Sequence, residues 1–165
     1  MNGAPLQIMQ PSLWKRIFLL KAGDETLYTM SYPKWYSTSA VIEGQGERWT
    51  IYKERWFSCE QKVRHGSDHL PTSSYKPNTW GKTGSFVLPN GERLEYAYGV
   101  WKNTNELFTQ NKVRIASLKR RHWYRSPIDI TLDQENALLE KHPWILLAVF
   151  RIMMERSQSQ AAAAS

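Results

Sequence analysis

The chain has 165 residues, enough for one domain, and its 41% hydrophobic and 13% aromatic residues exclude an intrinsically disordered protein. A single cysteine, Cys59, excludes an internal disulfide framework, so the fold must be held together by its core. Lysine and arginine number 22 against 15 aspartates and glutamates, and the resulting net charge of +7 favours anionic partners.

Targeting signals are absent from the sequence pattern. Residues 1–10 contain no charged region followed by an apolar one, so they do not resemble a signal peptide. The most apolar run, at residues 144–154, has 11 residues including one arginine, whereas a spanning helix needs about 20. We therefore expect a cytoplasmic protein without a transmembrane segment, associated with membranes only peripherally.

Short stretches of alternating apolar residues predict β-strands over the first 132 residues. Asn90-Gly91 is the strongest hairpin signal, because both residues accept positive φ at a tight turn. Residues 65–84 are rich in proline, glycine, serine and threonine and predict a long loop with one short strand. No repeat of fixed period is apparent. About ten or eleven strands at roughly ten-residue spacing indicate a sandwich or a barrel, and the clearest lie at residues 13–20, 27–32, 39–42, 48–52, near Tyr75, 86–88, 94–98, 113–116 and 128–132.

The pattern changes in the last part of the chain. Asp133 is the expected N-cap of a short polar turn, and Pro143 suits the first position of a second helix. From residue 144 to 154 that helix is apolar on every face except at Arg151, so it must be surrounded by protein or lipid. It rises about 16 Å, too short for a bilayer but suited to the inside of a small barrel. We expect residues 157–165 to form a disordered polar and alanine tail.

Many short strands followed by one hydrophobic helix form an unusual order. It is accompanied by Trp14-Lys15-Arg16, Gly23, Ser39-Ala40-Val41-Ile42, Trp49-Thr50-Ile51, Trp80, Asn90-Gly91 and the apolar segment Trp144 to Met154. These features resemble the tubby-like superfamily, which includes tubby C-terminal domains, phospholipid scramblases and the plant LURP-one-related proteins. The resemblance implies a mainly β fold, a closed antiparallel β-barrel of about twelve strands around a hydrophobic C-terminal helix. This domain would cover residues 8–156, with its helix at 143–156.

The resemblance supports an expectation about the fold more strongly than one about the function. The sequence has no acidic run of the calcium-site type expected in a scramblase. The basic pair with which tubby proteins contact phosphoinositides has no aligned counterpart in this chain.

One segment concentrates the positive charge and is the best functional candidate. No acidic residue lies between residues 112 and 125, and its candidate lipid- or anion-binding residues are Lys112, Arg114, Lys119, Arg120, Arg121, Trp123 and Arg125. Aromatic residues are favoured at headgroup depth, and each basic side chain near an anionic leaflet contributes about 1 kcal/mol. With the resemblance, this segment predicts a turn that binds anionic phospholipid headgroups at a membrane surface.

Two alternatives stay open for this segment. An intracellular protein partner or, less favoured, a single-stranded nucleic acid could use the same charges, the nucleic acid by stacking on the aromatic rings. The segment could also be an ordinary solvated turn whose charges neighbour Glu54, Glu92 or Glu106 in the fold.

Catalytic and metal chemistry has little support in the sequence. His65, Asp68 and His69 lie within five residues, but the surrounding glycine and proline favour a solvated loop, so no metal or cofactor is expected. Cys59 is expected to be a buried structural thiol rather than a nucleophile. Phosphate loops, Gly-x-Ser-x-Gly elbows and His-Glu-x-x-His pairs are absent, and we do not expect an enzyme.

Overall fold

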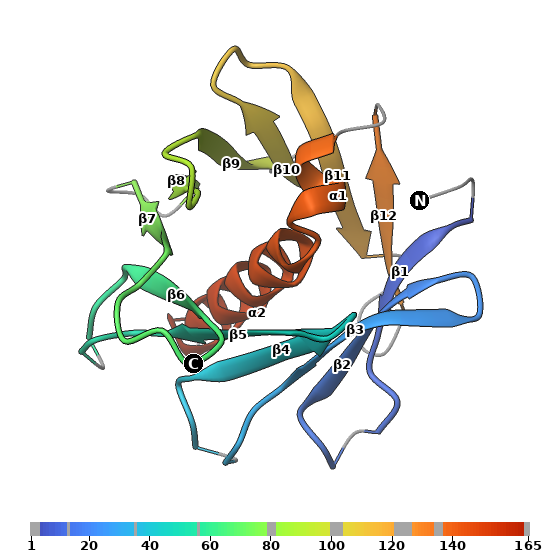
Figure 1. Cartoon of the computed structure of the whole chain (residues 1–165), viewed down its shortest axis with the longest axis horizontal. Coiled ribbons are helices and arrows are strands. Elements are labelled where there is room, and N and C mark those ends of the chain that lie inside the picture. Colours follow the sequence, from blue (N-terminus) through green and yellow to red (C-terminus); the bar gives the residue numbers. More distant parts are fainter. Residues whose placement is uncertain are drawn as a thin grey trace.

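The computed structural model is a ring of strands closed around a helix (Figure 1). It describes residues 4–12, 14–34, 36–55, 57–78, 82–99, 104–120, 127–133 and 137–163, with side chains up to residue 159. Within these residues the barrel has twelve strands, β1 (Leu6–Met9), β2 (Ile17–Ala22), β3 (Glu25–Ser31), β4 (Ala40–Gly44), β5 (Glu47–Tyr52), β6 (Gln61–His65), β7 (Ser73–Pro77), β8 (Thr83–Val87), β9 (Arg93–Gly99), β10 (Thr104–Thr109), β11 (Arg114–Arg120) and β12 (Ile128–Leu132). Two helices follow, α1 (Ala137–Lys141) and α2 (Trp144–Ala163).

The barrel is an antiparallel meander closed by its first strand. Each strand pairs with the next, and β1 pairs with both β2 and β12, where Leu6 lies opposite Ala22 on one side and Ile130 on the other. Closure pairs the strand edges that an open sheet would leave free. The predicted mainly β fold, a closed barrel around a C-terminal helix, is confirmed, and the sandwich alternative is excluded.

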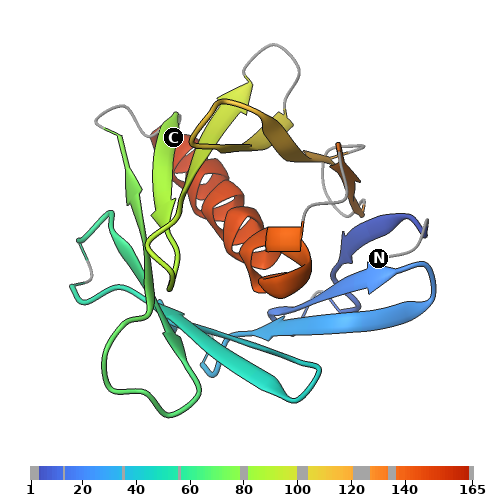
Figure 2. The ribbon, with the colours of Figure 1, turned by 45° about the horizontal axis from the view of Figure 1, so that its top comes forward.

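Helix α2 runs through the interior of the barrel (Figure 2). Every residue from Trp144 to Phe150 is buried, because strands surround the helix on all sides and leave it no solvated face. The helix continues to Ala163, so residues 157–163 are helical and not the disordered tail that we expected. Serine hydroxyls and alanines support this extension. Ser157 Oγ donates to the Met153 carbonyl at 3.0 Å, and alanine is the best helix former.

Strand β11 departs from simple alternation. Sequence periodicity predicts that Val113 and Ile115 share one face and Arg114 and Ala116 the other. In the structure Ile115 and Ala116 are both buried and Val113 is exposed. The cause is a register shift opposite Leu107 and Phe108, where a bulge inserts one extra residue and changes which side chains face inward.

Other differences lie where strands are short or polar. β1 has four residues, and β6 is polar apart from Val63, so neither stands out in the sequence. In residues 65–84, predicted to be a long loop with one short strand near Tyr75, that strand is confirmed as β7, and the start of β8 lies there as well. The Asn90-Gly91 hairpin is confirmed between β8 and β9, but among its described residues only Gly91 has positive φ, at 80°.

The connections between strands alternate between the two ends of the barrel, because consecutive strands are antiparallel. We call the end toward which α2 runs the exit end. Its connections are residues 10–16, 32–39, 53–60, 78–82, 100–103 and 121–127. The connections at the opposite end are residues 23–24, 45–46, 66–72, 88–92, 110–113 and 133–136.

Candidate functional site

A crevice of about 460 Å³ opens at the exit end, between α2 and the connections that follow β1, β3 and β5. Three cations line it, one from each of two connections and one from the helix. Its lining includes Arg16, Lys53, Arg151, the carboxylate of Glu155 and the ring of Tyr32. The crevice is therefore polar and carries a net positive charge.

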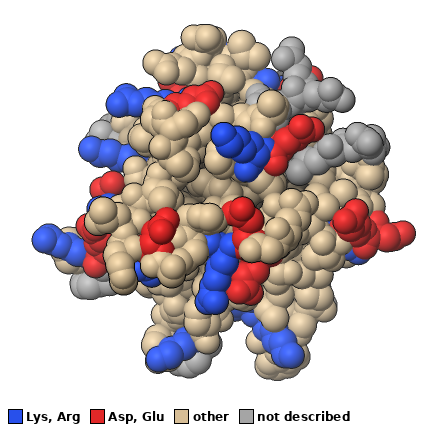
Figure 3. Space-filling model, viewed as in Figure 1, with Lys and Arg blue, Asp and Glu red and all other residues tan. Residues whose placement is uncertain are grey.

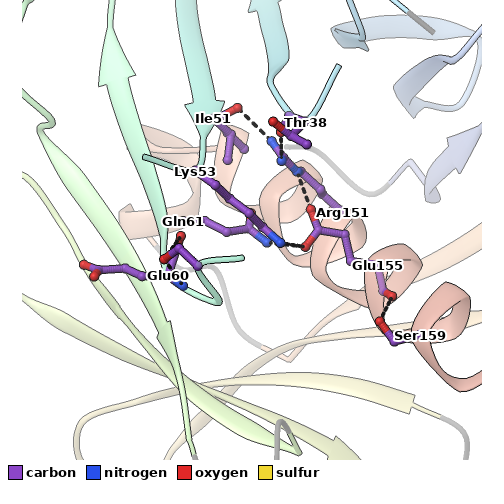
Figure 4. A network of polar contacts seen from close by, with 9 residues as sticks. Thr38, Ile51, Lys53, Glu60, Gln61, Arg151, Glu155 and Ser159 are labelled. Atoms are coloured by element: carbon purple, nitrogen blue, oxygen red, sulfur yellow. Dashed lines mark hydrogen bonds and ion pairs between the residues drawn. The ribbon is translucent and has the colours of Figure 1, made fainter. Parts of the chain in front are cut away.

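Arg151 forms the inner wall of the crevice and has no exposed surface (Figure 4). Its Nε donates to Glu155 Oε1 at 3.1 Å, one helical turn further along α2. Its Nη1 donates to the carbonyl of Ile51 at 2.7 Å, and its Nη2 donates to the carbonyl of Thr38. A buried guanidinium needs such partners, because an unpaired charge away from water costs several kcal/mol.

Glu155 is the acceptor at the centre of this network. Besides Arg151, it accepts from Lys53 Nζ at 2.9 Å and from Gln61 Nε2 at 3.0 Å, both from the β5–β6 side of the barrel (Figure 4). The network thus ties α2 to residues 32–39 through the Thr38 carbonyl and to residues 53–60 through Lys53. These contacts fix two neighbouring exit-end connections to the rigid helix.

The ring of Tyr32 lies close to two guanidinium groups. Arg16 Cζ lies 3.7 Å and Arg151 Cζ 5.9 Å from its centroid, within the range of cation–π attraction. Burial raises the pKa of Tyr32 above its usual value, and the two arginines partly oppose that effect. The phenol therefore stays neutral near pH 7, and the ring acts as a support for Arg16 rather than as an acid or base.

Charge is distributed unequally between the two ends of the barrel. The described exit-end connections carry Glu54 and Glu60 against the cations Lys15, Arg16, Lys34, Lys53, Arg55 and Lys82. The described connections at the opposite end carry Lys112 against the anions Asp24, Asp68, Glu92 and Asp133. On the face seen in Figure 3, basic and acidic side chains lie close together. Among the described residues, the connections of the exit end are therefore mainly basic and those of the opposite end mainly acidic.

Large aromatic side chains are exposed beside these cations. Trp14 is 97% exposed, Tyr36 62% and Phe57 63%, and all three lie in exit-end connections. Cations next to exposed aromatic rings suit a surface that is anionic on the outside and apolar just beneath, as at a lipid headgroup layer. The sequence predicts that Trp14 lies in a strand over residues 13–20, but in the structure this strand, β2, begins only at Ile17.

The predicted basic segment is divided by the fold. Lys112 and Arg114 lie toward the opposite end, where Lys112 pairs with Glu95 and Arg114 binds Asp133 at 2.6 Å and Glu106 at 3.2 Å. These acidic partners raise the pKa of Arg114. These two residues therefore fit the alternative in which the charges of the segment are paired with neighbouring carboxylates. Glu106 is one of the carboxylates named in that alternative.

The rest of the segment reaches the exit end. Lys119 and Arg120 are the last two residues of β11, and not part of a turn as we expected. They lie opposite Asp129 and Ile128 of β12. Arg121, Trp123 and Arg125 lie outside the described residues, so their role as candidates stays a prediction.

The remaining candidates behave as separate surface groups. His65 Nε2 lies 2.5 Å from Glu47 Oε2 at the opposite end, and no group of histidine, cysteine, aspartate and glutamate among the described residues could hold a metal ion. Cys59 is exposed, so the prediction of a buried thiol is wrong. It lies in the β5–β6 connection at the exit end, outside the core. Neither described helix is long and apolar enough to cross a membrane.

Comparison with known proteins gives information about the fold only. No protein-family model matches the sequence, and no curated protein matches it. The structure is similar to the X-ray structure of a protein from Arabidopsis thaliana, AT5G01750, with a TM-score of 0.61. That similarity covers 94% of this chain and 91% of the Arabidopsis chain at 9% sequence identity. At so low an identity the similarity shows a shared fold.

Proposed function

We propose that this protein is a non-enzymatic, tubby-like module that binds anionic phospholipids peripherally at a membrane surface. One observation carries the proposal. The exit end gathers lysine and arginine around exposed aromatic rings, whereas the connections of the opposite end are mainly acidic. At about 1 kcal/mol per basic side chain near an anionic leaflet, several such cations support reversible binding.

The tubby-like part of the proposal is supported by fold and by scattered residues. The hydrophobic segment of the resemblance is the buried part of α2, and Gly23 occupies the β2–β3 turn with φ of 58°. The barrel shared with the Arabidopsis protein agrees with the architecture that the resemblance implies.

Flotation with vesicles tests this function. The protein should float with phosphatidylserine-containing vesicles and not with pure phosphatidylcholine vesicles. Binding should weaken steeply as salt rises, because exposed charges are screened beyond about 8 Å at physiological ionic strength. Equal binding to neutral vesicles, or none to anionic ones, would contradict the proposal.

A gel-shift assay with a single-stranded oligonucleotide distinguishes the alternative function. Bases can stack on exposed rings such as Phe57, so the exit end also offers the elements of a nucleic-acid surface. We expect weak, strongly salt-dependent binding to the oligonucleotide. Micromolar binding at physiological salt without any flotation would replace the lipid proposal with the nucleic-acid one.

The basic segment has its own test. Charge reversal of Lys119, Arg120 and Arg121 together should weaken flotation with anionic vesicles, since each removes one attractive charge and adds a repulsive one. Reversal of Lys112 alone is the control, because that residue pairs with Glu95 toward the opposite end. Flotation unchanged by the triple substitution would remove this segment from the lipid-binding surface.

A further inference from the structure

Two exit-end connections have the same sequence pattern. Residues 33–39 are Pro-Lys-Trp-Tyr-Ser-Thr-Ser, and residues 54–60 are Glu-Arg-Trp-Phe-Ser-Cys-Glu. A cation, a tryptophan, a second aromatic residue and a serine thus recur in the same order, 21 residues apart. The repeat is short, and its two copies occupy equivalent places in the barrel, one after β3 and one after β5.

The backbone and hydroxyl contacts of the two connections are also the same. The Ser37 N–H donates to the Lys34 carbonyl at 3.0 Å, and the Ser58 N–H donates to the Arg55 carbonyl at 2.9 Å. Each serine hydroxyl then accepts from the N–H two residues later, at 3.1 Å in both connections. Serine hydroxyls stabilise turns in this way. The two connections are therefore copies of one turn.

This turn presents an aromatic ring to solvent. Tyr36 and Phe57 occupy equivalent positions and are 62% and 63% exposed. The Lys34 ammonium lies 5.6 Å from the first ring and the Arg55 guanidinium 5.9 Å from the second. The hydrogen bonds of the turn involve the backbone and the serine. A single exposed ring is ordinary, whereas the same exposed ring in two copies of one turn indicates a binding role.

The other exit-end connections continue the pattern in sequence. Each of the six contains one tryptophan with a lysine or arginine within two residues, at positions 14, 35, 56, 80, 101 and 123. The structure describes Trp14 among these, at 97% exposure. The other two tryptophans of the chain, Trp49 and Trp144, are buried. Tryptophan and lysine or arginine together are the residues that concentrate at membrane–water interfaces.

We propose that the exit end is an interfacial anchor that inserts its exposed aromatic rings into the headgroup layer of an anionic bilayer. This proposal rests on the proposed function and adds the orientation and the depth of binding. The barrel stands end-on, with Trp14, Tyr36 and Phe57 below the plane of the phosphates and the neighbouring cations at that plane. The acidic opposite end points away from the membrane, as charge complementarity requires.

The buried network makes this anchor rigid. Arg151 holds the first turn through the carbonyl of Thr38, and Glu155 holds the second through Lys53. Because both turns are fixed to α2 before binding, little conformational freedom is lost when the rings insert.

The single cysteine permits a direct test of orientation. Cys59 is exposed two residues after Phe57, and Asp68 is exposed at the other end of β6. A nitrobenzoxadiazole label on Cys59 should brighten and shift to the blue when phosphatidylserine vesicles are added. The same label in Cys59→Ser/Asp68→Cys should not change. Equal changes at both positions, or a change only at position 68, would overturn end-on docking.

A pair of matched variants tests the insertion of the rings. Tyr36→Ser/Phe57→Ser keeps every charge and should lower partitioning into anionic vesicles about tenfold or more, as expected when two partly buried aromatic contacts are lost. Leu70→Ser/Val113→Ser removes two exposed apolar side chains from the opposite end and should leave partitioning unchanged. Equal partitioning of the two variants would overturn the anchor.

These outcomes separate the anchor from the function on which it rests. If the wild-type protein floats with anionic vesicles but the Cys59 label does not respond, the anchor is wrong and the lipid-binding function stands. If the wild-type protein does not float, both are wrong.

Discussion

Arg151 is the single charged residue in the apolar stretch of α2, and its position follows from the network at the exit end. The sequence shows an interruption in the apolar pattern, but its cause lies in partners more than 90 residues away. These are the carbonyls of Ile51 and Thr38. The guanidinium closes the polar end of the core and positions the two repeated turns.

Replacing Arg151 with methionine should destabilise the protein by about 2 to 4 kcal/mol, because two buried carbonyls lose their donor. Lys53→Met is the control. It removes a more exposed partner of Glu155 and should cost about 1 kcal/mol or less. Chemical denaturation of both variants measures the free energy of unfolding. A loss for Arg151→Met no larger than that for Lys53→Met would contradict the structural role of the network.

His142 makes stability depend on pH. Burial lowers the pKa of His142 below its usual value of 6.5, and the neighbouring Lys141 lowers it further. As pH falls, His142 therefore binds a proton at a higher pH in the unfolded chain than in the folded protein. The stabilisation is complete above the unfolded pKa and is lost as pH falls from about 6.5 toward the lower folded pKa. Thermal melts should show that Tm falls less between about pH 7.5 and about pH 5 in His142→Asn than in the wild type.

The exposed His69 supplies the control for that melt series. His69→Asn should lose stability with falling pH as the wild type does. A slope for His142→Asn equal to that of His69→Asn would show that His142 does not contribute.

At the scale of elements, α2 is the core around which the strands close. Trp144, Ile145, Leu146, Leu147 and Val149 are at most 1% exposed. Each such side chain contributes about 1.5 to 3 kcal/mol on burial, and the net stability of a domain is only about 5 to 15 kcal/mol. The strands alone are therefore not expected to form a stable barrel.

Truncation tests this dependence. A chain that ends at His142 should be unfolded or insoluble, and Leu147→Asp in the full chain should behave similarly. A chain that ends at Gln158 keeps all the residues of α2 that are known to be buried and should keep a cooperative thermal transition. A sharp melt from the chain that ends at His142 would contradict a barrel built on its helix.

The elements with regular periodicity could be predicted from the sequence, and those set by long-range contacts could not. The apolar stretch of α2 and the β8–β9 hairpin carry local signals, hydrophobicity on all faces and Asn90-Gly91. β6 was missed because its inward Gln61 is polar, and the reason is its bond to Glu155. The inward faces of β11 depend on a bulge that alternation does not reveal.

The candidate site was predicted only in part, because residues that are adjacent in the sequence are not the ones that lie together in the structure. The segment from Lys112 to Arg125 is one charged run, but β11 carries it from one end of the barrel to the other. The exit-end cations come instead from separate short connections, none of which contains a long run of basic residues. A tryptophan every 21 to 24 residues beside a cation was the signal that could have found them.

At the scale of the whole molecule, the barrel separates a basic, aromatic end from an acidic one. Every second connection lies at the same end of the barrel. Because the described connections at one end are mainly basic and those at the other mainly acidic, the molecule has a charge polarity along its axis. Such polarity orients a protein toward an anionic surface before contact. On this proposal the exit end, and not the net charge of the protein, binds the membrane.

Two charge-reversal variants with the same change in net charge test that claim most directly. Lys15→Glu/Lys34→Glu/Arg55→Glu alters the exit end, and Arg48→Glu/Arg93→Glu/Lys141→Glu alters exposed cations toward the opposite end. Flotation with phosphatidylserine vesicles at physiological salt should be lost in the first variant and kept in the second. Equal loss in both variants, or loss in the second alone, would contradict the account.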